Sequence, residues 1–206
     1  MIRTSSYLAL VVSALTVCAP AAFANEDLPW VLEPEEYTIY AEVLDGWYAG
    51  SDATPVIKDH TVFYTSNDTV ARELRHVQQE LPALQQSAVN DFIAKNLRPY
   101  PLAAFINQRS RYRLLPESEF ISLFQHGEEG WGRFNARYPD SDGVLSLSRT
   151  GFNIARTQAL VCIANHWNRL TASCLYLLLE KQADSSWMIT KSIRIWNSWS
   201  LEPHAE

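Results

Sequence analysis

The spacing of apolar residues changes once along this chain, from a helical period to the period of a β-strand. Between residues 33 and 138 the apolar side chains mostly recur every three or four positions, which is the repeat of an α-helix. From residue 144 to residue 197 they alternate with a period of two, which is the repeat of a strand. Helices followed by strands are typical of an α+β domain with a single core.

Proline, glycine and acidic residues set the boundaries of the expected helices. Acidic residues and proline favour the first turn of a helix, and glycine commonly follows its last turn. The expected helices cover residues 33–50, 68–80, 82–95 and 116–124, and a further one carries Trp131, Phe134 and Tyr138 on a single face. Residues 56–65 are rich in β-branched and aromatic side chains and are expected to form a strand.

The last third of the chain is expected to form a sheet. Its strands are predicted over residues 144–150, 154–166, 173–181 and 186–197. Because consecutive strands joined by short turns pair antiparallel, we predict N-terminal helices packed on a curved antiparallel β-meander. This arrangement is loosely like the nuclear-transport-factor-2-like or cystatin-like folds. We expect residues 25–206 to be one α+β domain.

Odd and even residue numbers separate the two faces of the predicted sheet. Even positions mix apolar with polar and aromatic side chains, so that face either lines a ligand cavity, contacts a partner or lies partly exposed beneath loops. Odd positions are almost wholly apolar, and we expect the helices to cover them: Ala159, Val161, Ile163, Leu175, Leu177, Leu179, Trp187, Ile189, Ile193 and Ile195, with Lys191 as the exception.

Two cysteines of the predicted sheet, Cys162 and Cys174, each lie six residues from Asn168. A hairpin folded at Asn168 would place them opposite each other, where a disulfide is geometrically feasible. Such a bond would stabilise the fold by about 2–3 kcal/mol in the chain-entropy model. The alternative is a pair of inert buried thiols.

The N-terminal residues have the pattern of a secretory signal peptide. Arg3 gives a positive start, an apolar stretch runs from Leu8 to Val17, and Ala22-Phe23-Ala24 matches a small-x-small cleavage site. We expect residues 1–24 to be removed and the mature protein to be periplasmic or secreted, in an oxidising compartment. Cys18 leaves a lipoprotein anchor as an alternative, and an uncleaved membrane anchor is another.

Charge and motifs narrow the function classes. With 17 Lys and Arg against 23 Asp and Glu, the net charge of -6 argues against nucleic-acid binding, which needs a basic surface. The chain has no G-x-S-x-G, P-loop or G-x-G-x-x-G motif and no metal-ligand spacing, so we predict no cofactor, no metal and no catalytic residue. Asp59 and His60 are adjacent on a predicted strand, and we expect their side chains to point to opposite faces without pairing.

The segment from Ser146 to Asn153, Ser-Leu-Ser-Arg-Thr-Gly-Phe-Asn, is the most distinctive of the chain. Arg149 either clamps an anion or carboxylate or, together with Asn153, satisfies the carbonyls of the turn. With Gln158 beside it, Arg149 heads a set of candidate binding residues: Arg149, Gln158, Tyr176, Arg194, Trp196, Trp167 and Asp59.

A resemblance extends these observations. The motif Leu147-Ser148-Arg149-x-Gly151-Phe152-Asn153, followed by Thr157-Gln158-Ala159-Leu160-Val161, resembles a domain found in exported bacterial proteins of unknown function. The resemblance runs from about Tyr37 to Trp196 and implies no activity, cofactor or catalytic residue.

We therefore expect a non-enzymatic binding module of the bacterial periplasm, of the immunity, inhibitor or accessory type, with a protein or small-molecule partner. The alternative is a small-molecule binder or an enzyme. In that case the mixed sheet face would line a cone-shaped cavity, with Arg149, Gln158, Asp59 and Tyr176 as its polar contacts.

Overall fold

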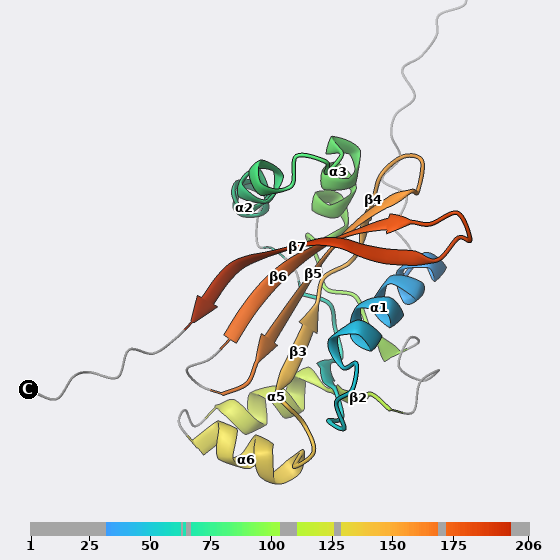
Figure 1. The fold of residues 1–206 in the computed structure, drawn as a ribbon. Coiled ribbons are helices and arrows are strands. Elements are labelled where there is room, and N and C mark those ends of the chain that lie inside the picture. Colours follow the sequence, from blue (N-terminus) through green and yellow to red (C-terminus); the bar gives the residue numbers. More distant parts are fainter. Residues whose placement is uncertain are drawn as a thin grey trace, which may run out of the picture.

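The computed structural model describes residues 32–62, 64, 67–103, 111–125, 129–168 and 172–198, without the side chains of residues 67–69 and 196–198. The predicted signal peptide lies outside these residues. The α+β class expected from the change of period is confirmed (Figure 1). The elements are α1 (Pro34–Trp47), β1 (Val56–Lys58), α2 (Asn67–Glu80), α3 (Gln86–Lys95), β2 (Arg113–Leu115), α5 (Glu117–Phe124), α6 (Glu129–Arg137), β3 (Val144–Leu147), β4 (Gly151–Phe152), β5 (Gln158–His166), β6 (Ala172–Lys181) and β7 (Trp187–Ser198).

The sheet is mixed, whereas an antiparallel meander was predicted. Its strand order is β2-β1-β3-β5-β6-β7, with β4 also paired to β5. From β3 to β7 all pairs are antiparallel, as expected, but β1 runs parallel to both β2 and β3. The predicted strand 56–65 ends at Lys58, and the predicted strand 144–150 is broken after Leu147.

Both faces of the sheet are covered, in contrast to the single covered face that was predicted. Figure 1 shows α1 on one side of the sheet, α2 and α3 on the other side, and α5 and α6 at one end. Odd-numbered residues of β5 and β6 pack against α1, as predicted from their apolar character. Even-numbered residues pack against α2 and α3, among them Leu160, Cys162, Cys174, Tyr176 and Leu178.

Two irregularities in the pairing of β6 with β7 explain a further difference from the prediction. The register shifts between Leu178 and Leu179 and again between Cys174 and Leu175. Since each shift of one residue exchanges the two faces of a strand, odd numbers do not keep to one face along β7. Trp187 and Ile189 lie on the α1 side as expected, but Ile193 and Ile195 pack on the side of α2 and α3.

Candidate functional site

Residues 148–150 connect β3 to β4 and are not part of either strand. Side chains from the helices form hydrogen bonds with the main chain of these residues. The carbonyl of Ser148 accepts the hydroxyl of Tyr40 at 2.8 Å. The N–H of Arg149 donates to Oδ1 of Asn96 at 2.7 Å, and its carbonyl accepts Nδ2 of the same residue at 3.0 Å. Buried main-chain groups need such partners, so α1 and α3 replace the missing strand neighbour.

Thr150 completes this connection. Its N–H donates to Oε2 of Glu36 at 2.9 Å, and its carbonyl accepts the ammonium of Lys95 at 3.3 Å. The bonds to Ser148, Arg149 and Thr150 therefore come from α1 on one face of the sheet and from the C-terminal end of α3 on the other.

Glu36 and Arg149 form an ion pair inside this connection. Glu36 is in the first turn of α1, where its carboxylate also accepts the N–H of Glu33 at 3.0 Å. Nε of Arg149 lies 3.2 Å from both carboxylate oxygens, and a second nitrogen of the guanidinium contacts Oε1. The two side chains are 0% and 2% exposed. Burial acts to lower the pKa of Arg149, but the hydrogen bond and charge of Glu36 outweigh it and raise that pKa.

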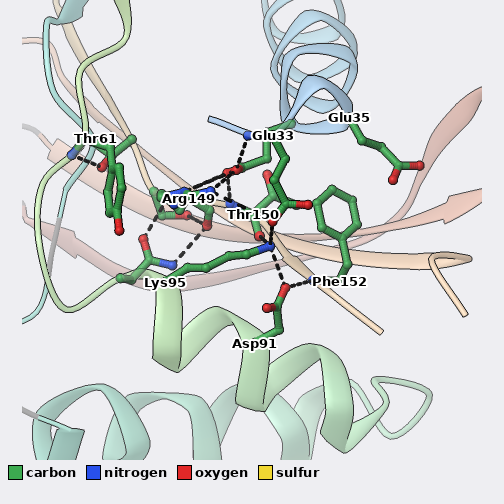
Figure 2. A network of polar contacts seen from close by, with 12 residues as sticks. Glu33, Glu35, Thr61, Asp91, Lys95, Arg149, Thr150 and Phe152 are labelled. Atoms are coloured by element: carbon green, nitrogen blue, oxygen red, sulfur yellow. Dashed lines mark hydrogen bonds and ion pairs between the residues drawn. The ribbon is translucent and has the colours of Figure 1, made fainter. Parts of the chain in front are cut away.

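The charged residues around this pair are joined into one network, drawn in Figure 2. The buried ammonium of Lys95 lies 2.5 Å from Glu33 and 2.8 Å from Asp91. Oδ2 of Asp91 also accepts the N–H of Phe152 at 2.7 Å. The network thus connects the start of α1, the end of α3 and β4.

The acidic start of α1 is neutralised by two further cations. Arg156 contacts Glu33 and lies 3.0 Å from Glu35, and Lys181 lies 2.6 Å from Glu35. Partial burial acts to raise the pKa of each glutamate, but hydrogen bonds from Lys95 and Arg156 lower that of Glu33, and bonds from Lys181 and Arg156 lower that of Glu35. The negative charges of both glutamates therefore stabilise the folded state through these ion pairs.

The glycine and phenylalanine of the distinctive motif serve packing. A Cβ on Gly151 would lie 2.5 Å from the carbonyl oxygen of Ala88 and 2.5 Å from Cβ of Phe92, so any side chain there would push α3 away from β4. Phe152 packs against Trp187, with ring centroids 5.8 Å apart. Gly151 therefore allows α3 to lie close to β4, whereas Phe152 belongs to the core on the α1 side of the sheet.

Asn153 and Gln158 close the turn that follows. Oδ1 of Asn153 accepts the N–H groups of Thr157 at 2.8 Å and Gln158 at 3.0 Å. The Gln158 side chain is buried; it accepts the N–H of Gln85 at 2.7 Å and donates to the carbonyl of Ala83 at 3.0 Å. Of the two interpretations of this segment, the geometry favours the structural one, with Asn153 satisfying N–H groups of the turn where carbonyls were expected.

The predicted binding residues do not converge on one site. The guanidinium of Arg149 is occupied by Glu36, Gln158 is bonded to the segment before α3, and Tyr176 lies buried under α2. Trp167 is half-buried after β5, and Arg194 is exposed on β7. Trp196 belongs to β7, but its side chain lies outside the described part of the chain. The predicted cavity lined by the mixed sheet face is therefore filled by α2 and α3.

The two cysteines are neighbours but not in the predicted register. Cys162 pairs with Tyr176, and Cys174 pairs with Ala164, so the cysteines are diagonal neighbours and not directly opposite. The reason is that the β5–β6 hairpin is centred one residue beyond Asn168. Both thiols are free and buried, with their Sγ atoms 2.9 Å apart.

A polar cluster lies beside these thiols. Tyr176 and Tyr64 contact each other through their hydroxyls and both donate to Oε1 of Glu73, at 2.6 Å and 3.2 Å. Burial raises the pKa of both tyrosines, and the neighbouring Glu73 adds to this. The two hydroxyls are therefore protonated donors that connect α2 to the sheet.

A pocket opens where the parallel strands β1 and β2 end. It has a volume of about 450 Å³ and is lined by Lys58, His60, Thr61, Val62, Pro99 and Glu117. Lys58 is the last residue of β1, and Glu117 follows β2 by two positions as the first residue of α5. The carboxyl ends of parallel strands are where many α/β proteins bind ligands, because the chain leaves the sheet there and the diverging loops form a hollow. We call this hollow the β1–β2 pocket.

The prediction that Asp59 and His60 cannot pair is wrong. Nδ1 of His60 lies 2.8 Å from Oδ1 of Asp59. The prediction assumed a continuous strand, but β1 ends at Lys58, and His60 bridges instead to Pro101. Two adjacent side chains are therefore able to meet at the pocket, with His60 lining it.

Sequence reasoning missed Lys58, Thr61, Pro99 and Glu117 as members of one pocket. Lys58 and Glu117 are far apart in the chain and become neighbours only through the parallel pairing of β1 with β2. Because β2 is only three residues long, it shows no alternation that could be recognised in the sequence. Lys58, a basic residue at the end of β1, was a signal that could have been noted.

A second hollow, of about 280 Å³, lies at the other end of the same strands. It is more polar and is lined by Tyr48, Arg111 and Arg113 together with residues 51–55. Arg111 already forms an ion pair with Asp45 at 2.7 Å, so its charge is less available to a ligand than the charges that line the β1–β2 pocket.

The described residues contain no group of three His, Cys, Asp or Glu side chains arranged to hold a metal ion. In the same part of the chain, no helix is both long and apolar enough to cross a membrane. Comparison of the chain with family models, with curated proteins and with solved structures gives no match in any of the three.

Proposed function

We propose that this protein is an exported, non-enzymatic binding module that receives a small ligand in the β1–β2 pocket. The observation that carries this proposal is the pocket itself, whose volume of about 450 Å³ is within the range that small ligands occupy. Its walls combine apolar surface from Val62 and Pro99 with the charged side chains of Lys58 and Glu117.

A comparison of paired and unpaired charged side chains supports this choice of site. The buried charges of Glu36, Arg149 and Lys95 are all bonded to one another or to the main chain, so they maintain the fold. In contrast, within the described residues neither Lys58 nor Glu117 has an ion-pair partner. Charged groups that a fold leaves unpaired in a concave surface are candidates for ligand contacts.

Export is the second component of the proposal and has its own test. It rests on the signal-peptide pattern of residues 1–24 and on the oxidisable cysteine pair. We expect the protein made in a bacterial host to appear in the periplasmic fraction with Asn25 as its first residue, which N-terminal sequencing would show. Full-length chain retained in the membrane fraction would contradict cleavage.

Ligand binding is tested with a fragment screen followed by NMR. We expect fragments that bind to shift the amide signals of Lys58 to Val62, and the Val62→Trp variant, which fills the pocket, to abolish those shifts. The matched control is Ile154→Trp, which adds the same side chain at a position that is 92% exposed on a turn. If no fragment perturbs the pocket amides of the wild-type protein, the proposed site is wrong.

A hydrolytic function is the second candidate, and the Asp59–His60 contact of 2.8 Å favours it. A carboxylate that orients an imidazole is a common arrangement for a general base. Turnover of a bound ligand that is lost in His60→Gln while binding persists would support the enzyme over the binding module.

A further inference from the structure

We propose that the β1–β2 pocket selects a small zwitterion of about dipeptide size, whose carboxylate meets Lys58 and whose ammonium meets Glu117. This inference rests on the proposed function and specifies its ligand class. It is based on one cation and one anion that line the same cavity without forming an ion pair with each other.

Lys58 is positioned to receive an anion. The side chain is half-buried at the end of β1, and its ammonium lies 3.7 Å from the centre of the Phe120 ring. A cation–π contact holds an ammonium in place without cancelling its charge. The same charge lies close to His166, whose pKa is lowered first by burial and then by Lys58. A ligand carboxylate would supply a charged hydrogen-bond acceptor, which none of the described residues provides to Lys58.

Glu117 offers the complementary contact. It is exposed at the first position of α5, where the positive end of the helix stabilises a carboxylate. No lysine or arginine of the described residues forms an ion pair with it. A ligand ammonium would therefore gain a partner without displacing an existing one.

The volume and the walls set the size and character of the ligand. A volume of about 450 Å³ is at the lower end of the range of small-ligand sites, so it suits a ligand larger than a free amino acid but smaller than a long peptide. A dipeptide with one apolar side chain, such as alanyl-leucine, is small enough to enter this space and occupies more of it than a free amino acid does. The apolar side chain would lie on Val62 and Pro99, which are both half-buried.

The test compares alanyl-leucine with its N-acetylated and its C-amidated forms by isothermal titration calorimetry. We expect each blocked form to bind the wild-type protein roughly tenfold more weakly, because each loses one charged contact. In Lys58→Met the free and amidated forms should bind equally, and in Glu117→Gln the free and acetylated forms should bind equally. The controls Lys191→Met and Glu80→Gln change exposed charges that do not line the pocket and should leave all three affinities unchanged.

The outcomes separate this inference from the proposed function. Equal affinity of the wild-type protein for all three peptides, or no peptide binding while fragments still shift the pocket amides, overturns the zwitterion and leaves the binding module in place. The absence of any response to peptides and fragments alike overturns both. Thermal unfolding of each variant establishes that a lost affinity reflects the changed charge and not a lost fold.

Discussion

Removing the charge of Glu36 is expected to be among the most damaging conservative changes in this protein. Glu36→Gln keeps the size of the side chain but leaves the guanidinium of Arg149, which is 2% exposed, without its counter-charge. It also introduces an amide donor where the carboxylate accepts the N–H groups of Glu33 and Thr150. Breaking one side of a buried ion pair costs about 3–5 kcal/mol, and most domains have only about 5–15 kcal/mol of stability in total.

Urea unfolding followed by tryptophan fluorescence measures this change in the free energy of unfolding. The matched control is Glu129→Gln, because Glu129 pairs with Arg133 at the surface, where such a pair contributes at most about 1 kcal/mol. The double variant Glu36→Gln with Arg149→Met should be less destabilised than Glu36→Gln alone, since it removes both charges together and keeps the same amide at position 36. A loss below about 1 kcal/mol for Glu36→Gln would refute the role assigned to the buried pair.

Three further predictions concern the network, the thiols and the motif glycine. The folded state lowers the pKa of Glu33 and Glu35, so their contribution to stability is present above the ordinary glutamate pKa and is lost as the pH falls through the lowered values. The urea midpoint of the wild-type protein should therefore drop in this acidic range. The drop should be smaller in Glu35→Gln, which has one of these groups fewer. Protein isolated from the periplasm should have Cys162 and Cys174 joined in a disulfide, giving an intact mass lower by two hydrogen atoms than that of the reduced protein; two alkylatable thiols after unfolding would contradict this. Gly151→Ala should cost roughly 1–3 kcal/mol, because its new methyl group meets the main chain of α3, and an unchanged unfolding midpoint would show that α3 moves freely.

The period of the apolar residues was sufficient to predict most of the helices and the long strands. It works for α1 and α2 because each buries one face over many residues, so the pattern repeats several times. β5 is buried on both faces, and its long apolar run marked it as a strand. Parity also placed Val161 and Leu177 on the α1 side correctly. The second layer of helices was missed because Gln158 and Tyr176 made the opposite face look polar, whereas their polar atoms are bonded within the protein.

The site could not be predicted in the same way. The β1–β2 pocket depends on the parallel pairing of two strands of three residues each, which leaves no periodic pattern in the sequence. The contact of Asp59 with His60 depends on where β1 stops, and strand ends are the least predictable feature of a chain. Arg149 was selected as a candidate binding residue from its motif, but its partner Glu36 lies 113 positions away, at the start of the predicted helix 33–50, and no pattern in the sequence indicates their pairing.

The connection between β3 and β4 has a consequence for how the protein unfolds. Glu36 approaches this connection from one face of the sheet and Asn96 from the other, and they bind the neighbouring N–H groups of Thr150 and Arg149. If α1 or α3 detaches from the sheet, it breaks hydrogen bonds to residues 148–150. The helix on the other face is bonded to the same residues and would be loosened too. The sheet and its two layers should open as a single cooperative unit, and the slowest-exchanging amide hydrogens of α1 and α3 should report the same free energy of opening.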